Sequence, residues 1–128
     1  SVHEKIEREI QTCLPYVKEF SANGLGEFFV SESMNRVVSQ WRPEEIPDAE
    51  FVLETNGSLF TKENWRKIRN IGKANLKVAI TVMSFDEMAY QYLSGTTYPI
   101  DRIVENLKFV KELRDQGIIN YLEIATVY

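Results

Sequence analysis

Short apolar runs alternate with helix-like runs along this chain, and the alternation leaves few folds open to it. The runs typical of β-strands cover residues 18–22, 50–54, 76–82 and 121–127. Between them, apolar residues recur every three or four positions, which is typical of amphipathic helices. Strands that alternate with helices predict right-handed crossovers and a parallel sheet. We therefore expect an α/β fold with about four parallel strands and flanking helices.

Capping residues and prolines set the expected helix boundaries. Ser, Thr and Asn side chains favour helix N-termini, and glycine favours the position after a helix C-terminus. Proline closes a helix because it cannot continue the hydrogen-bond ladder. The expected helices are residues 2–14 before Pro15, Ser31 or Ser33 to Trp41 before Pro43, Thr61 to Gly72, 86–93, and Ile100 to Gly117.

The two ends of the sequence favour a piece of a larger architecture. The first helix has no N-cap signal, and no helix follows the strand at 121–127 to cover its outer face. A parallel sheet is usually covered on both faces, and a complete (β/α)₈ barrel needs roughly twice this length. We expect one domain, residues 1–128, that is an internal fragment of a partial TIM-like barrel. The alternatives are a small open sheet, or copies that self-associate through exposed sheet edges.

Composition restricts the partners and the location. The net charge of -4, without long Lys or Arg runs, argues against nucleic acid. No apolar stretch approaches the ~20 residues of a membrane-spanning helix, and no signal-peptide pattern follows Ser1. The single cysteine, Cys13, is expected to be a small core residue on the first helix, and it excludes a cysteine-cluster metal site within the chain. We expect a cytoplasmic protein without nucleic-acid or membrane partners.

Polar and small residues gather where the expected strands end. Gly24, Gly26 and Glu27 follow the first strand, Asn56 follows the second, and Thr81 lies near the end of the third. Ligands of parallel α/β proteins bind at these carboxyl ends. Glycines let the backbone approach a ligand closely, and the glutamate adds an acceptor for a cationic group. The set suits a polar small molecule. It contains no nucleophile–base pair, so we assign no catalytic residue and no metal ligand; ordinary turn residues are the alternative interpretation.

Several short motifs follow one another in a fixed order. They are Gly24-x-Gly26-Glu27, Thr55-Asn56-Gly57, Ile80-Thr81-Val82, Tyr90 with Gly95, and Glu105-Asn106-Leu107-x-Phe109. In that order and spacing they resemble the middle of the radical S-adenosylmethionine superfamily, especially the branch with a C-terminal iron–sulfur (SPASM) region. The resemblance covers roughly residues 15–128.

The resemblance implies a role for each of the strand-end residues. In such enzymes a three-cysteine loop holds a 4Fe–4S cluster, and electron transfer cleaves S-adenosylmethionine to methionine and a 5′-deoxyadenosyl radical that abstracts hydrogen from the substrate. Gly24, Gly26 and Glu27 match the motif that receives the amino group of the cofactor. Asn56 matches a position that lines the cofactor pocket. Thr81 matches a position whose hydroxyl faces the methionine end of the cofactor.

Departures from the family pattern limit what this chain can do. Met83 stands where many members have Asp, and Ser94 stands where many have an Arg that pairs with the cofactor carboxylate, a charge-assisted contact. The Cys-x-x-x-Cys-x-x-Cys loop is absent. The resemblance therefore implies part of a radical S-adenosylmethionine oxidoreductase whose parent binds the cofactor, the cluster and a small-molecule or peptide substrate. By itself the fragment is expected to bind neither cofactor nor cluster and not to be catalytically competent.

Other functions stay open on the residues alone. A degenerate barrel that acts as a binding or scaffold module would explain Met83 and Ser94. A hydrolase would use Glu27 and Glu54 as an acid/base pair. Glu54 and Glu123 alternate with apolar neighbours, so both are expected to point into a barrel lumen, where they would bind substrate or pair with a lysine such as Lys77.

Overall fold

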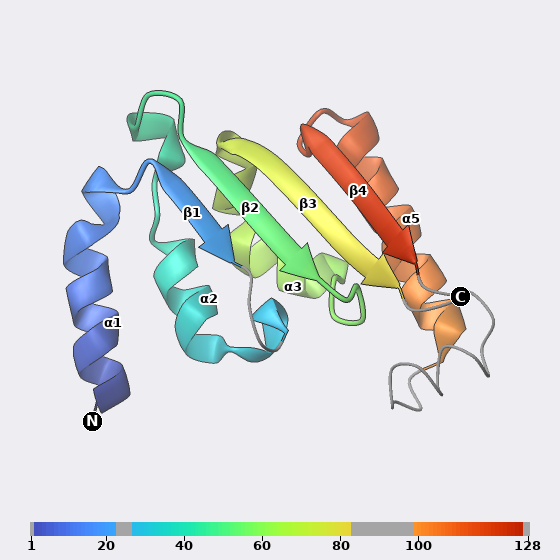
Figure 1. The fold of residues 1–128 in the computed structure, drawn as a ribbon, viewed down its shortest axis with the longest axis horizontal. Coiled ribbons are helices and arrows are strands. Elements are labelled where there is room, and N and C mark those ends of the chain that lie inside the picture. The colour runs from blue at the N-terminus through green and yellow to red at the C-terminus, as the bar shows by residue number, and fades with distance from the viewer. Residues whose placement is uncertain (1, 23–26, 83–98, 127–128) are drawn as a thin grey trace.

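The fold is that of a computed structural model, which describes residues 2–22, 27–82 and 99–126. Helices and strands alternate along these residues, and short 3₁₀ segments occupy several of the connections (Figure 1). The elements are α1 (Val2–Cys13), β1 (Glu19–Ala22), α2 (Glu32–Ser39), β2 (Glu50–Thr55), α3 (Lys62–Ile68), β3 (Asn75–Val82), α5 (Ile100–Asp115) and β4 (Tyr121–Thr126).

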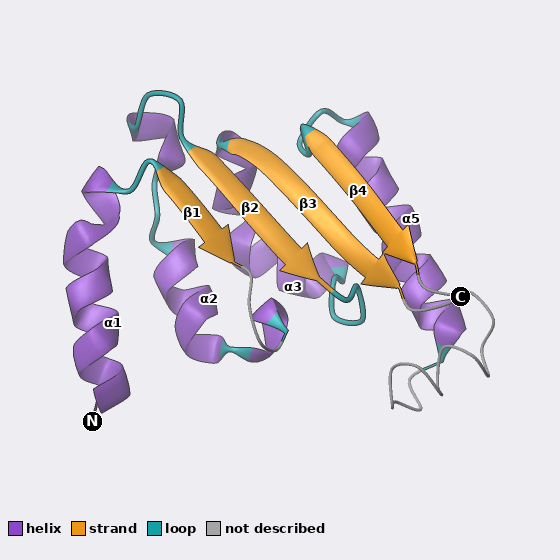
Figure 2. Ribbon diagram, in the orientation of Figure 1, coloured by secondary structure: helices purple, strands orange, loops and turns teal. Residues whose placement is uncertain are grey.

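The four strands form one parallel sheet in the order β1-β2-β3-β4 (Figure 2). Helices α2, α3 and α5 lie together on one side of it (Figure 1). Sequential strand order with the crossovers on one side differs from a doubly wound sheet, in which the strand order reverses and helices cover both faces. The prediction of an α/β fold with four parallel strands and flanking helices is confirmed.

A continuous apolar core fills the space between the sheet and its helices. Phe51 and Leu53 of β2 are fully buried, whereas Val52 between them is half-buried. The ring centroids of Trp41 and Phe51 lie 5.8 Å apart. The indole nitrogen of Trp41 donates a hydrogen bond to the carbonyl of Val17, 3.1 Å away. Trp41 is therefore a core residue.

The other face of the sheet is open among the described residues. Alternate strand positions, including Val52, Glu54, Ala79 and Thr81, are half-buried or exposed there. Both faces of a parallel sheet are normally covered, so this polar open face is unusual. Glu54 and Glu123 lie on it and flank Ala79 in register. Among the described residues, Lys77 forms an ion pair with Glu50, whose Oε1 atom lies 3.9 Å from the lysine Nζ atom.

Most of the predicted helix caps are confirmed. Ser31, rather than Ser33, caps α2, and its hydroxyl accepts a hydrogen bond from the backbone N–H of Met34 at 3.2 Å. Thr61 caps α3 in the same way, through the N–H of Asn64 at 3.1 Å. Gly117 follows the end of α5 with a φ of +78°, the left-handed conformation that favours glycine.

The predicted role of Gly72 is wrong. Helix α3 ends at Ile68, and Gly72 lies within the 3₁₀ segment Arg69–Lys73 instead of capping the helix. A Cβ at this position would come within 2.9 Å of the Cγ2 atom of Ile118. Glycine is needed here because the chain after α5 packs closely against this backbone.

The prediction that Cys13 is a core residue is also wrong, because its side chain is exposed. Helix α1 lies outside the β1 edge of the sheet (Figure 1). It is joined to α2 by Glu7, which pairs with Arg36 at 3.2 Å and accepts a hydrogen bond from Ser33 at 3.0 Å. Ile10 packs against the core, but much of the remaining apolar stripe extends beyond the sheet.

Several sequence predictions fall outside the described residues. They are the expected helix at 86–93 and the residues Gly24, Gly26, Met83, Tyr90, Ser94 and Gly95. Among the helices that the structure does describe, none combines the length and the apolar character needed to cross a bilayer.

Candidate functional site

Glu27 connects the chain after β1 to the carboxyl end of β2. Its Oε1 atom accepts a hydrogen bond from the hydroxyl of Thr55. Its Oε2 atom accepts one from the backbone N–H of Asn56, 2.9 Å away. These two hydrogen bonds hold the carboxylate in place. The residue is only half-buried, so it is not fully shielded from solvent. A carboxylate has about four acceptor positions, so both oxygens keep capacity for a ligand.

Thr55 orients this carboxylate. It is the last residue of β2, and strand alternation places it on the buried face with Phe51 and Leu53. Its hydroxyl donates to Glu27 and accepts a hydrogen bond from the N–H of Gly57 at 3.1 Å. A buried hydroxyl needs such partners because its desolvation is otherwise uncompensated.

The loop after β2 is a tight turn held by its own side chains. The Oδ1 atom of Asn56 accepts hydrogen bonds from the N–H and the hydroxyl of Ser58, at 2.9 and 2.6 Å, as asparagine commonly does in turns. Gly57 has a φ of +80°. A Cβ on it would approach the Cγ2 atom of Ile80 to 3.1 Å. The exposed Asn56 amide nitrogen has no hydrogen-bond partner within the described ranges.

Asn106 fastens the same loop to α5. Its side chain is buried, and its Nδ2 atom donates hydrogen bonds to the carbonyls of Gly57 at 2.8 Å and Ser58 at 3.0 Å. Polar contacts therefore run without a break from Glu27 through Thr55 and Gly57 to Asn106. They fix the carboxyl end of β2 from two sides, the chain after β1 and helix α5.

Thr81 lies apart from this network. It is exposed on the open face of β3, whereas its neighbour Ile80 is buried opposite Thr55 in the register. Within the part of the chain that the structure describes, no hydrogen bond joins the Thr81 side chain to Glu27 or Asn56. Of the predicted site residues, the structure therefore brings Glu27 and Asn56 together and directs Thr81 toward a different face.

Sequence reasoning missed Thr55 and Asn106 as contributors to this arrangement. Both carried a usable signal. Thr55 continues the buried alternation of β2 with a hydroxyl, and Asn106 falls between Ile103 and Val110 on the buried side of α5. A polar side chain in an apolar stripe needs a buried partner, although the stripe itself does not identify that partner.

The predicted hydrolase pair is disfavoured by strand geometry. Successive strand residues point to opposite faces. Glu54 is exposed on the open face, whereas Glu27 is bound to Thr55 on the helix-covered side. The two carboxylates therefore do not face a common reaction centre.

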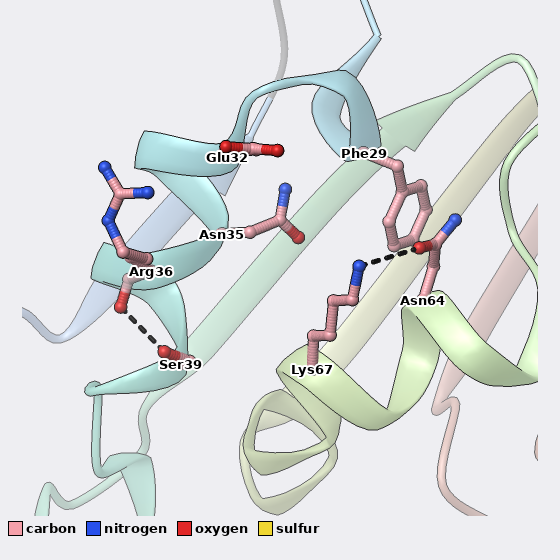
Figure 3. Close-up of a pocket in the computed structure, with 7 residues that line it drawn as sticks. All are labelled: Phe29, Glu32, Asn35, Arg36, Ser39, Asn64 and Lys67. Carbon is pink, nitrogen blue, oxygen red and sulfur yellow. Dashed lines mark hydrogen bonds between the residues drawn. The ribbon is translucent and has the colours of Figure 1, made fainter.

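A separate hollow of about 470 Å³ lies between α2 and α3 (Figure 3). None of the predicted site residues lines it. Several of its polar groups already bind one another: Lys67 donates to Asn64 at 3.4 Å, and Ser39 donates to the carbonyl of Arg36 at 2.7 Å. The hydrogen bond with Glu7 raises the pKa of the Arg36 guanidinium and directs its charge toward α1. The carboxyl end of the sheet is therefore the better candidate for a site.

Comparison with protein-family models, with curated proteins and with solved structures finds no match to this chain. The resemblance to radical S-adenosylmethionine enzymes therefore stays a prediction that depends on the sequence motifs. The geometry at the end of β2 is independent evidence for which residues form a polar cluster there.

Proposed function

We propose that this chain forms the cofactor-binding edge of a radical S-adenosylmethionine protein and part of the wall of a partial (β/α) barrel. The observation that carries the proposal is the Glu27 carboxylate, held at the carboxyl end of the sheet by Thr55 and Asn56. An ammonium group binds a fixed carboxylate strongly where acceptor positions remain, because the contact is charge-assisted. Glu27 would receive the amino group of the cofactor.

The other residues would contribute position and polarity. The backbone N–H of Asn56 binds the carboxylate, and the exposed side-chain amide of the same residue would contact a second polar group of the cofactor. Thr81 would present its hydroxyl from the open face of β3. Substrate, a small molecule or a peptide, would lie over that face, where Glu54 and Glu123 are exposed. Thr55 and Asn106 would act as positioning residues, since their contacts are with the loop and with Glu27.

The chemistry that this chain supplies would be limited to binding and orientation. A 4Fe–4S cluster, when bound, supplies the electron that cleaves the cofactor. The chain has one cysteine, so the cysteine ligands of a cluster would have to lie outside these 128 residues. By themselves, these residues would bind neither the cofactor nor the cluster in a stable form, and they would not start a radical reaction.

A second function fits the same contact. Both oxygens of Glu27 already accept hydrogen bonds within the protein, so the residue also serves as a brace between the chain after β1 and the end of β2. In a degenerate barrel that acts as a binding or scaffold module, this brace would persist without the radical chemistry. The two functions differ in whether Glu27 affects a bound cofactor.

Anaerobic reconstitution with iron and sulfide tests the proposal, using the protein as its gene encodes it, with any residues that flank these 128. We expect a cluster whose reduced EPR spectrum changes when S-adenosylmethionine is added. Glu27→Gln should keep the iron content and weaken cofactor binding by about tenfold to a hundredfold, the value of a charge-assisted hydrogen bond. Glu112→Gln, an exposed glutamate on α5, is the matched control.

Thr55 variants separate positioning from folding. Thr55→Val removes the hydroxyl that holds Glu27 and should weaken cofactor binding, whereas Thr55→Ser keeps the hydroxyl and should restore it. A protein that acquires no cluster, or whose cluster does not respond to the cofactor, would favour the scaffold function. Equal cofactor affinity in the wild type and Glu27→Gln would exclude Glu27 as the acceptor.

A further inference from the structure

The hollow between α2 and α3 carries polar groups that the contacts within the protein leave free. Its lining comes from α2, from α3 and from the 3₁₀ segment Phe28–Val30 before α2, and no strand of the sheet contributes to it (Figure 3). Its volume, about 470 Å³, lies in the range of small-molecule sites, about 300–1,000 Å³. The hollow is therefore large enough for a ligand of its own, apart from the carboxyl end of the sheet.

Asn35 supplies an acceptor that no group of the protein uses. The residue is 9% exposed, and its Nδ2 atom donates hydrogen bonds to the carbonyls of Phe28 at 3.2 Å and Ser31 at 2.7 Å. These two bonds fix the amide and direct its Oδ1 atom into the hollow (Figure 3). Among the described residues, no hydrogen bond reaches this oxygen. A largely buried amide oxygen is costly to leave without a donor, so the site suits a ligand that brings one.

Two charges of opposite sign lie on the two helices that form the hollow. Glu32 is exposed on the first turn of α2, one turn before Asn35. Lys67 is exposed on α3, and its Nζ atom makes only a long hydrogen bond of 3.4 Å, to the Oδ1 atom of Asn64. Within the described ranges, neither Glu32 nor Lys67 forms an ion pair. Both charges are therefore available to a ligand.

Phe29 forms the apolar wall of the hollow. Its ring packs edge-on against the rings of Phe28 and Phe60, with centroids 5.3 Å away in each case. These contacts hold the ring in place, although the residue is only half-buried. The second cation of the lining, Arg36, binds Glu7 through two of its nitrogens, so its charge is directed away from the ring. One apolar wall thus stands beside one free anion and one free cation.

We propose that this hollow binds a free α-amino acid with an apolar side chain. The ammonium group is bound by the Glu32 carboxylate and the Oδ1 atom of Asn35, the carboxylate by Lys67, and the side chain packs against Phe29. Each charged end of the zwitterion then meets an opposite charge, and the contacts are charge-assisted. The carboxyl terminus of a peptide fits less well, because its neutral N–H leaves Glu32 without a charged partner.

Saturation-transfer NMR with free amino acids tests this proposal on the protein as its gene encodes it. A ligand of this size with two charged contacts should bind with a Kd of about 1 mM, and L-phenylalanine and L-leucine are the probes. L-Phenylalaninamide lacks the carboxylate, and N-acetyl-L-phenylalanine lacks the ammonium group. Each should bind about tenfold more weakly than L-phenylalanine, the value of one charged hydrogen bond.

Variants of exposed residues locate the bound amino acid without disturbing the fold. Glu32→Gln and Lys67→Gln should each weaken L-phenylalanine binding about tenfold. Glu63→Gln, in the first turn of α3, and Lys108→Gln, on α5, are the matched controls, since both residues are exposed and neither lines the hollow. Glu27→Gln should also leave this binding unchanged, so the result does not depend on S-adenosylmethionine.

Each of the other outcomes overturns the proposal. Absence of binding by both L-phenylalanine and L-leucine at several times the expected Kd would show that the hollow is not an amino-acid site. Equal binding of N-acetyl-L-phenylalanine would indicate a peptide terminus instead, and equal binding of the amide would exclude Lys67 as the carboxylate partner. Binding that is lost in Glu27→Gln but kept in Glu32→Gln and Lys67→Gln would place the amino acid at the carboxyl end of the sheet.

Discussion

The side-chain amide of Asn106 donates a hydrogen bond to the backbone carbonyl of Gly57, 2.8 Å away, and so fastens the loop after β2 to helix α5. The second hydrogen bond from the same nitrogen reaches the carbonyl of Ser58. Both carbonyls belong to the turn that follows Asn56, the residue whose N–H binds Glu27. The geometry of the candidate site therefore depends on α5, a helix that is far from β2 in the sequence.

Replacing Asn106 with alanine should lower the free energy of unfolding by about 2 kcal/mol, because two carbonyls would lose their buried donor. Asn75→Ala is the matched control. Asn75 is exposed, and its side chain makes a 3.3 Å contact with Glu50, so its loss should change stability by less than about 0.5 kcal/mol. Urea denaturation measures both variants. Equal losses in the two variants would show that Asn106 does not anchor the loop.

Gly57→Ala should destabilise the protein more than Gly117→Ala. Both glycines have a φ near +80°, so both substitutions carry the cost of the left-handed conformation, about 1 kcal/mol. At Gly57 the added methyl would also press on Ile80 at 3.1 Å, whereas at Gly117 no atom lies within 4 Å. Thermal unfolding of the pair isolates the contribution of this contact. A larger loss for Gly117→Ala would contradict the packing described here.

The ion pair between Glu7 and Arg36 should make stability depend on acid pH. The hydrogen bond from Arg36, aided by one from Ser33, holds the pKa of the Glu7 carboxyl below its ordinary value of 4.5. Because the pKa of Glu7 is lower in the folded state than in the unfolded state, the ion pair stabilises the fold fully at pH values above the unfolded-state pKa. This stabilisation is lost as the pH falls through the folded-state pKa. Denaturation of wild type and Glu7→Gln across this range should give curves that differ near neutral pH and converge in acid. A constant difference would exclude Glu7 as the titrating group, and added salt should reduce the difference.

Local signals predicted much of the fold. Strand alternation identified all four strands to within about two residues, and the capping rules placed Ser31, Thr61 and Gly117 correctly. Gly57, in the Asn56-Gly57 pair, adopts the positive φ that this residue pair favours in tight turns. These features depend on residues close in sequence, so a single sequence contains the information that determines them.

Features that depend on distant segments could not be predicted in the same way. Cys13 lies on the apolar stripe of α1, but α1 extends past the edge of the sheet and leaves this side chain exposed. Gly72 has the residue type of a helix cap, but its close approach to Ile118 explains the glycine. Thr55 and Asn106 showed that a partner was needed, yet only the tertiary arrangement identifies Glu27 and the Gly57 carbonyl as those partners.

The most direct test of the proposed function is cleavage of S-adenosylmethionine by the reconstituted, reduced protein as its gene encodes it, compared with the 128 residues alone. We expect the former to bind a 4Fe–4S cluster and to release 5′-deoxyadenosine, and Glu27→Gln to release much less at equal iron content. The 128 residues alone should do neither. Absence of cleavage by the cluster-loaded wild type would contradict the account, as would a cluster assembled by these residues on their own.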